Sequence, residues 1–315
     1  MMRSIYIYIM VLVVLILPAC ASRASKSAEA ANEAPKSEVQ KRFPYITVPN
    51  HILAEERRGY MTEHFWDRFD FADTLALAQM DSVALTHAYI SWLRNGVDLT
   101  KNNGEPMRRL MRRAATSRKM FDYFFALSET VLHDPNSPFR CDELYIPVLE
   151  EVLASPYYDE YERLAPQYDL DMAMKNRVGH KANNFRYTTA SGRTSSLYDI
   201  KSEFVLIYIH NPGCPMCRDI QAELTASVEV SEMIAAKRLV VLAIYPDRDL
   251  TEWRKYKLPE PWISGYDKGC VIESKQLYDL RAIPSMYLLD GNKCVMLKDC
   301  TSVADISSVL AYFNR

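Results

Sequence analysis

The sequence predicts an all-α domain over residues 43–177, followed by an α/β domain over residues 178–315. In the first region, apolar residues recur at the three- and four-residue spacing of one helix face. From Ser195 onwards, apolar runs of strand length alternate with runs of helix length, a pattern typical of parallel strands covered by helices. The chain has 315 residues, and about 270 of them lie beyond the N-terminal segments, which is enough for two hydrophobic cores.

The N-terminus has the pattern of a signal peptide over residues 1–19. The apolar run Ile5–Leu17 follows a basic residue and is too short to span a bilayer comfortably. It ends in Leu17-Pro18-Ala19-Cys20, which resembles the lipobox of bacterial lipoproteins. The resemblance implies that Cys20 is lipidated. An uncleaved anchor and a plain secretory signal are the alternatives, and either would also export the protein.

Residues 20–42 are expected to form a flexible tether. They are rich in Ala, Ser, Glu and Lys and contain no aromatic residue, so they cannot bury enough apolar surface to fold alone. A reach of about 25 Å would hold a domain clear of the lipid head groups. No acidic cluster follows Cys20, which by similarity to related lipoproteins implies the periplasm-facing side of the outer membrane. The expected location is therefore the cell envelope, with the membrane contacted through the lipid anchor.

Three rows of apolar residues predict core-facing helices in the first domain. The rows are Leu77, Met80, Ala84, Ala88 and Trp92; Met120, Phe124, Leu127 and Val131; and Leu144, Val148 and Val152. Three segments can end a helix and turn the chain: Asn102-Asn103-Gly104, Asp134–Pro138 and Ser155-Pro156. No set of side chains in this region has the spacing of a catalytic constellation.

Four strands and four helices are expected in the second domain. The strands are Phe204–Ile209, Leu239–Tyr245, Met286–Leu289 and Cys294–Lys298. The helices follow Cys217, lie near Leu250–Tyr256 and near Ser274–Leu280, and close the chain over Val303–Phe313. The last two strands are joined by Asp290-Gly291-Asn292, which is a hairpin turn signal.

The strongest functional signal in the chain is Cys214-Pro215-Met216-Cys217. These residues lie between the predicted strand Phe204–Ile209 and a helix-compatible run. With Cys214 at the N-cap, Pro215 takes the first helical position, where a missing N–H costs nothing. The amide of Cys217 can then point at the Cys214 sulfur, and this favours the thiolate, which is the nucleophile in disulfide exchange. Pro215 and Met216 support the site by tuning its reduction potential.

Two other roles for the cysteine pair stay open from the residues alone. A zinc site would need two further ligands at short, matched spacing, and Cys270, Cys294 and Cys300 stand singly, so no metal site is predicted. A redox-inert structural disulfide is the other alternative, although so short a loop gains little from closure. The three single cysteines and Cys141 are expected to be small buried side chains or free thiols.

Several residues at the start of the second domain resemble the opening of the thioredoxin-like redoxin family. They are Gly179–Phe185, Gly192, Ser196-Leu197 and Pro212–Cys217. The similarity is greatest to its membrane-tethered TlpA/ResA-like thiol-disulfide oxidoreductases. It implies a thioredoxin-like fold with an inserted βα unit in the C-terminal half. In similar bacterial lipoproteins, a helical domain of unknown function precedes this domain.

Further along the chain, Ala282–Asp290 resembles the loop in which a cis-proline of that family faces the active-site thiols. The resemblance implies that Pro284 is cis and that the backbone of Ile283 can pair with an extended substrate strand. A trans proline that opens a strand is the alternative. Peroxidases of the same fold carry Thr or Ser three residues before the reactive cysteine, whereas position 211 is Asn, which argues against a peroxidase.

Together these expectations predict an extracytoplasmic, lipid-anchored thiol–disulfide oxidoreductase in which Cys214 attacks and Cys217 resolves the mixed disulfide, without metal or cofactor. The family resemblance implies disulfide-containing protein substrates, their reduction, and an upstream membrane thiol–disulfide electron donor. A periplasmic disulfide oxidase or isomerase and a redox-inert binding or scaffold lipoprotein are the alternatives. The net charge of −2 gives no sign of nucleic-acid binding.

Overall fold

The computed structural model describes residues 42–75, 77, 82–97 and 104–314. The expected signal peptide over 1–19, the lipidation site Cys20 and the tether up to residue 41 lie outside these residues and stay predictions. Within the described ranges, no helix combines the length and the apolar character that a bilayer crossing requires.

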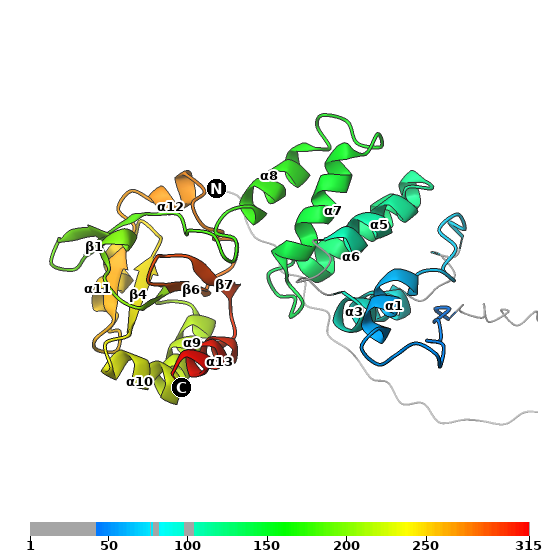
Figure 1. Cartoon of the computed structure of the whole chain (residues 1–315). Helices are drawn as coiled ribbons and strands as arrows, with labels where there is room; N and C mark the ends of the chain where they lie inside the picture. The colour runs from blue at the N-terminus through cyan, green and yellow to red at the C-terminus, as the bar shows by residue number, and fades with distance from the viewer. Residues whose placement is uncertain (1–41, 76, 78–81, 98–103, 315) are drawn as a thin grey trace, which may run out of the picture. The chain divides into compact units, whose positions relative to one another are not determined.

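The N-terminal half of the described chain is helical, as predicted (Figure 1). Its helices are α1 Arg57–His64, α3 Ser82–Asn95, α5 Glu105–Ala114, α6 Arg118–Leu132, α7 Asp142–Ala154 and α8 Leu164–Ala173. Helix α6 ends just before the predicted break Asp134–Pro138, and α7 ends at the predicted break Ser155-Pro156. At the start of α6, the Ser117 hydroxyl accepts the Met120 amide at 3.2 Å and so satisfies a free helix N–H.

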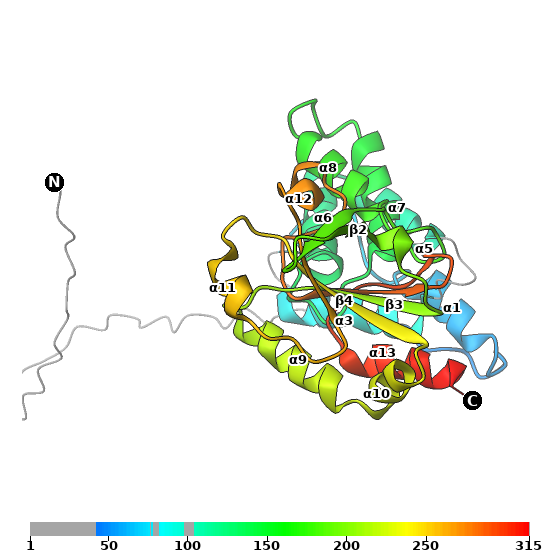
Figure 2. The same ribbon diagram turned by 90° about the vertical axis from the view of Figure 1, so that its left-hand side faces the viewer.

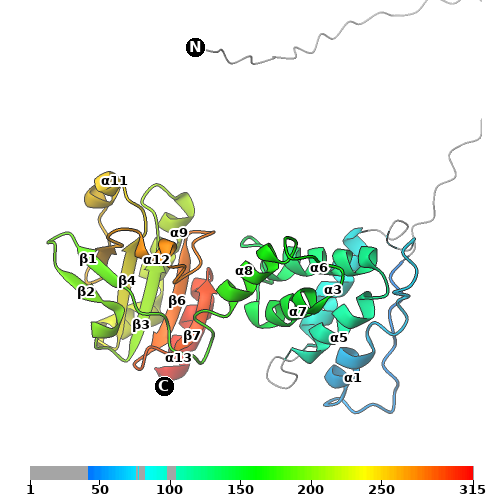
Figure 3. The ribbon, with the colours of Figure 1, turned by 90° about the horizontal axis from the view of Figure 1, so that it is seen from above.

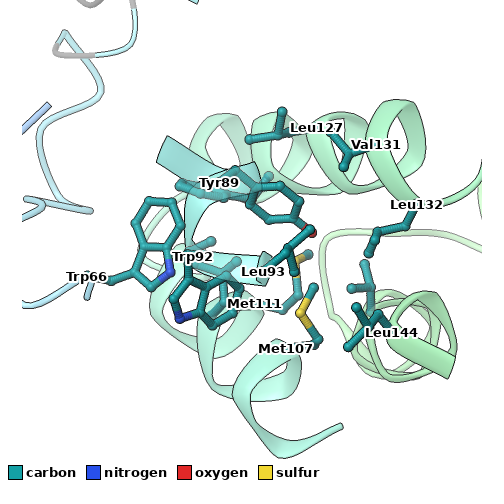
Figure 4. Packing of buried hydrophobic residues seen from close by; sticks show 14 of the residues in the cluster. Trp66, Tyr89, Trp92, Leu93, Met107, Met111, Leu127, Val131, Leu132 and Leu144 are labelled. Carbon is teal, nitrogen blue, oxygen red and sulfur yellow. The ribbon is translucent and has the colours of Figure 1, made fainter. Parts of the chain in front are cut away.

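A continuous aromatic and aliphatic core holds these helices together (Figure 4). The predicted rows on α6 and α7 are buried throughout, and on α3 Ala88 and Trp92 are buried. Trp92 packs edge-on against Trp66, with ring centres 5.7 Å apart, and the Trp92 indole N–H donates to the Thr62 carbonyl at 3.3 Å. Burial of each large apolar side chain contributes about 1.5–3 kcal/mol, so this cluster is the main source of stability in the helical domain.

The second half is an α/β domain built on one sheet. Its strands are β1 Arg186–Thr189, β2 Thr194–Ser196, β3 Phe204–Ile209, β4 Leu239–Tyr245, β5 Ile263–Tyr266, β6 Ser285–Asp290 and β7 Val295–Cys300. Their order is β2-β1-β5-β4-β3-β6-β7, and Figure 3 shows β2 and β7 towards opposite edges. Strands β3, β4 and β5 are parallel, whereas β6 and β7 form an antiparallel hairpin next to β3.

Helices cover both faces of this sheet. They are η1 Leu197–Asp199 (3-10), α9 Pro215–Ala226, α10 Val228–Ala235, α11 Leu250–Lys255, α12 Val271–Ser274 and α13 Val303–Phe313. Figure 2 shows α9, α10 and α13 together on one side of β3 and β4. On β3, Phe204, Leu206 and Tyr208 face this layer, while Val205, Ile207 and Ile209 enter a second core on the other face. Because β3 is buried on both faces, its sequence is continuously apolar.

Most of the predicted elements of this domain are present. Strands β3 and β4 have the predicted bounds, and β6 and β7 differ from theirs only at the ends. Gly291 and Asn292 form the hairpin turn. The segment between β4 and β6 carries α11 and β5, which supply the inserted βα unit. Elements α10, β1, β2 and β5 were not predicted: β1 and β2 are short and polar, and β5 contains a glycine.

The helix predicted over Ser274–Leu280 is wrong, because α12 ends at Ser274. Cys270 and Gln276, on either side of α12, have φ of 52° and 51°, in the left-handed region that interrupts a right-handed helix. Beyond α12, the Leu277 carbonyl accepts hydrogen bonds from two asparagine side chains that lie much earlier in the chain. One backbone carbonyl beyond α12 is therefore bound by residues that are distant in the sequence.

Candidate active site

The two cysteines of the Cys-Pro-Met-Cys segment lie where β3 passes into α9. Cys214 is the N-cap of α9 and Pro215 is its first residue, as predicted. The Cys217 amide donates to the Cys214 sulfur at 3.2 Å, which is the predicted contact. This contact places a backbone N–H of the first helical turn against the Cys214 sulfur.

The two thiols differ in access. The Cys214 side chain is half-buried and Met216 beside it is 59% exposed, whereas Cys217 is 0% exposed. Burial raises the pKa of Cys217 to about 12, so this thiol stays protonated at neutral pH. All six described cysteines, these two included, are free thiols. The arrangement therefore leaves the Cys214 side chain partly exposed and shields the Cys217 sulfur.

The loop around Pro284 faces the Cys214 sulfur. The Ile283–Pro284 peptide bond is cis, in agreement with the expectation from the resemblance. The Cys214 thiol lies 3.6 Å from the Ile283 carbonyl oxygen. The structure thus brings Cys214, Cys217, Ile283 and Pro284 together, while the role of the loop in substrate binding stays a prediction.

Asn211 organises the turn between β3 and α9. Its side-chain oxygen accepts the Gly213 amide at 2.9 Å, and its side-chain nitrogen donates to Asp247 at 2.7 Å. Its backbone amide points at the Cys217 sulfur at 3.5 Å. From the sequence alone, Asn211 argues only against a peroxidase. The Asn-Pro-Gly order before Cys214 is a turn signal that indicates this supporting role.

A buried aromatic cluster lies under the cysteines and was not predicted. Tyr208 donates a hydrogen bond to the Cys217 carbonyl at 2.5 Å, and its ring stacks on His210 with centres 5.0 Å apart. His210 is 0% exposed, and neither ring nitrogen has a hydrogen-bond partner among the described residues. Burial lowers the pKa of His210 to about 4, so the imidazole is neutral at pH 7.

The zinc alternative finds no support in the geometry. Within the described residues, no group of three or more His, Cys, Asp and Glu side chains is placed to hold a metal ion. The pair Cys214 and Cys217 is bordered instead by apolar side chains and by backbone groups. Two thiols in this arrangement can exchange with a disulfide.

A Cys-x-x-Cys pair at the start of a helix, facing a cis-proline loop on a mixed sheet of this order, defines a thioredoxin-like domain. The model of the AhpC/TSA family matches residues 178–297, and that of DUF5106, a domain of unknown function, matches residues 19–176. The chain therefore belongs to the AhpC/TSA thioredoxin-like family and carries an N-terminal DUF5106 domain.

Several solved structures are similar to this chain. A thioredoxin-like protein from Bacteroides caccae is 40% identical, and the match covers 86% of this chain and 99% of that chain with a TM-score of 0.82. The C-terminal domain of an uncharacterized protein from Bacteroides fragilis is 48% identical over 43% of this chain and 98% of that chain, with a TM-score of 0.42. The thioredoxin domain of a thiol-disulfide oxidoreductase from Bacteroides vulgatus is 19% identical over 44% of this chain and 99% of that chain, with a TM-score of 0.38. A comparison with curated proteins gives no match.

Proposed function

We propose that this protein is a thiol–disulfide oxidoreductase that reduces disulfide bonds of proteins in the cell envelope. One observation carries the proposal: the partly exposed Cys214 is the N-cap of α9, and its sulfur accepts the amide of Cys217, whose own thiol is shielded. A reachable nucleophile with a protected partner is the arrangement that two-step disulfide exchange requires.

In the first step, the Cys214 thiolate attacks one sulfur of the substrate disulfide. The substrate S–S bond breaks, one substrate sulfur leaves as a thiolate and takes a proton, and a mixed disulfide forms with Cys214. In the second step, Cys217 gives up its proton and attacks the Cys214 sulfur. The second substrate sulfur leaves as a thiol, and a Cys214–Cys217 disulfide remains. Two electrons have then passed from the enzyme pair to the substrate.

The direction of exchange and the anchoring belong to the same proposal. A membrane thiol–disulfide donor returns two electrons to the oxidised pair, and lipidation at Cys20 holds the domain at the periplasm-facing outer membrane. The lipobox-like Leu17-Pro18-Ala19-Cys20 supports the anchor. The rival directions, oxidation and isomerisation, differ in potential: about −270 mV suits a reductant, whereas about −120 mV suits an oxidant.

The test is the reduction of insulin disulfides by the purified protein with dithiothreitol as electron donor. The wild-type protein accelerates the reaction, Cys214→Ser abolishes the acceleration, and Cys217→Ser slows turnover by leaving mixed disulfides. Cys300→Ser is the matched control, since Cys300 is a partly buried free thiol whose pKa is raised by burial. Full activity of Cys214→Ser would end the catalytic assignment.

A further inference from the structure

The loop that carries Ile283 and Pro284 is tied to the helical domain on its downstream side. Ser285, the next residue, is fully buried, and its hydroxyl donates to Asp299 Oδ1 at 2.5 Å. The other carboxylate oxygen of Asp299 lies 3.0 Å from Arg140 Nη2, and the same guanidinium also donates to the Asp299 carbonyl. Arg140 belongs to the helical domain, between α6 and α7. A chain of polar contacts thus leads from that domain to the residue after Pro284.

The upstream side of the loop is tied to the same domain. The Arg281 guanidinium donates to Nε2 of His133, the C-cap residue of α6. His133 is buried, and Asp169 of α8 lies 3.4 Å from the same ring nitrogen. Arg281 also pairs with Asp279 at 2.6 Å, so its side chain is held from two directions. The loop is therefore clamped on both sides of the cis peptide bond.

The contacts among Arg140, Asp299 and Ser285 are suited to fixing the position of the loop. The side chains of Arg140 and Asp299 are only 14% and 13% exposed. A buried ion pair adds little net stability, because desolvation offsets the attraction, but loss of one partner leaves the other charge buried and uncompensated. Burial raises the pKa of the Asp299 carboxyl while Arg140 and Ser285 lower it, so its charge depends on these two partners. Asp299 also has φ of 48°, a costly backbone for a non-glycine residue that its surroundings must enforce.

The residues that make these contacts belong to one compact unit of the chain. The described residues from 42 onwards fall within a single compact unit. The match to the Bacteroides caccae protein extends over 86% of this chain, which includes helices as well as sheet, with a TM-score of 0.82. The contacts that reach the loop are therefore made within one folded unit.

We propose that the helical domain positions the substrate loop: through Arg140 and His133 it fixes the Ile283–Pro284 segment over Cys214, so that an extended polypeptide can pair with the loop backbone while its disulfide is attacked. This inference rests on the proposed function and names its substrate class, which is an extended polypeptide disulfide. A small aromatic disulfide has no backbone to pair and needs only the Cys214 sulfur. The two kinds of substrate therefore separate loop positioning from sulfur chemistry.

The test compares Arg140→Gln with wild type on two probes, a synthetic peptide pair joined by one disulfide and the small aromatic disulfide of Ellman's reagent. Arg140→Gln should raise KM for the peptide about tenfold with little change in kcat. A change of this size is typical when a contact outside a binding site is energetically coupled to that site. Its rate with the small disulfide should equal that of wild type. Arg140→Lys, which keeps the charge, should restore part of the peptide affinity, and Ser285→Ala should impair it from the loop side.

Lys298→Gln is the matched control. Lys298 Nζ pairs with Asp142 of α7 at 2.6 Å, so it joins the same domain to the residue of β7 before Asp299, without the link to Ser285. Lys298→Gln should leave the peptide KM unchanged. Loop positioning would be overturned if Arg140→Gln and Lys298→Gln raised the peptide KM equally. It would also be overturned if Arg140→Gln reacted more slowly than wild type with both probes. A wild-type protein that reduces neither probe would instead overturn the proposed function itself.

Discussion

Replacing His210 with phenylalanine should make the protein more resistant to acid. The imidazole stacks on Tyr208 and lies 5.6 Å from the Tyr256 ring, and it is buried without a hydrogen-bond partner among the described residues. Phenylalanine keeps a flat ring in this space but cannot take up a proton. Since burial lowers the pKa of His210 from 6.5 to about 4, the folded protein resists protonation that the unfolded chain accepts.

The size of the effect follows from the two pKa values. Above pH 6.5 the imidazole is neutral in both states, so the folded state carries no penalty. As the pH falls from 6.5 to 4, His210 binds a proton in the unfolded state but stays neutral in the folded state. The free energy of unfolding therefore decreases. The interval is about 2.5 pH units at about 1.36 kcal/mol each, so about 3 kcal/mol of unfolding free energy is lost by pH 4 through this one group.

The assay is urea denaturation of wild type and His210→Phe at pH 7 and at pH 4. The loss of unfolding free energy between the two pH values should be smaller in the variant by about 3 kcal/mol. Tyr256→Phe is the control, because it removes a neighbouring hydroxyl and keeps the imidazole. Burial raises the pKa of Tyr208 and Tyr256, so both stay neutral throughout this range. Equal losses in wild type and His210→Phe would refute the reasoning.

Three further outcomes are expected. In Cys214→Ser, the remaining Cys217 should react with iodoacetamide at pH 8 more than about 100-fold more slowly than free cysteine, because burial raises its pKa; alkylation at an ordinary rate would contradict this. Asn211→Ala removes two side-chain hydrogen bonds and should lower the unfolding free energy of the reduced protein by about 1–2 kcal/mol in denaturant titrations, whereas no change would show that the turn holds without them. Trp92→Ala should cost about 3–5 kcal/mol by the same method, and a loss below about 1 kcal/mol would mean that the helical core closes around the gap.

The central strands and the cysteine turn could be predicted because their signals are local. Strand β3 is a continuous apolar run, and Cys214-Pro215 begins a helix by rules that involve only neighbouring residues. The same local order gave the contact between the Cys217 amide and the Cys214 sulfur. These features depend on residues within a few positions of one another.

What the sequence did not reveal depends on partners that are distant along the chain. The segment after α12 is not helical: Gln276 has a left-handed backbone, and asparagine side chains from earlier in the chain bind the Leu277 carbonyl. In the sequence, His210 has no feature that separates it from other polar residues at strand ends. In the structure it is buried and stacks on the Tyr208 ring. The pairing of Arg140 with Asp299 joins two domains and leaves no trace in residue spacing.

The most direct test of the exchange chemistry is to incubate Cys217→Ser with a disulfide-bonded protein substrate, quench with acid and map the linkage by mass spectrometry. The geometry at the start of α9 predicts a persistent mixed disulfide between the substrate and Cys214, and none in the Cys214→Ser, Cys217→Ser double variant. A linkage through any other cysteine, or no covalent product, would contradict the assignment of Cys214 as the attacking thiol.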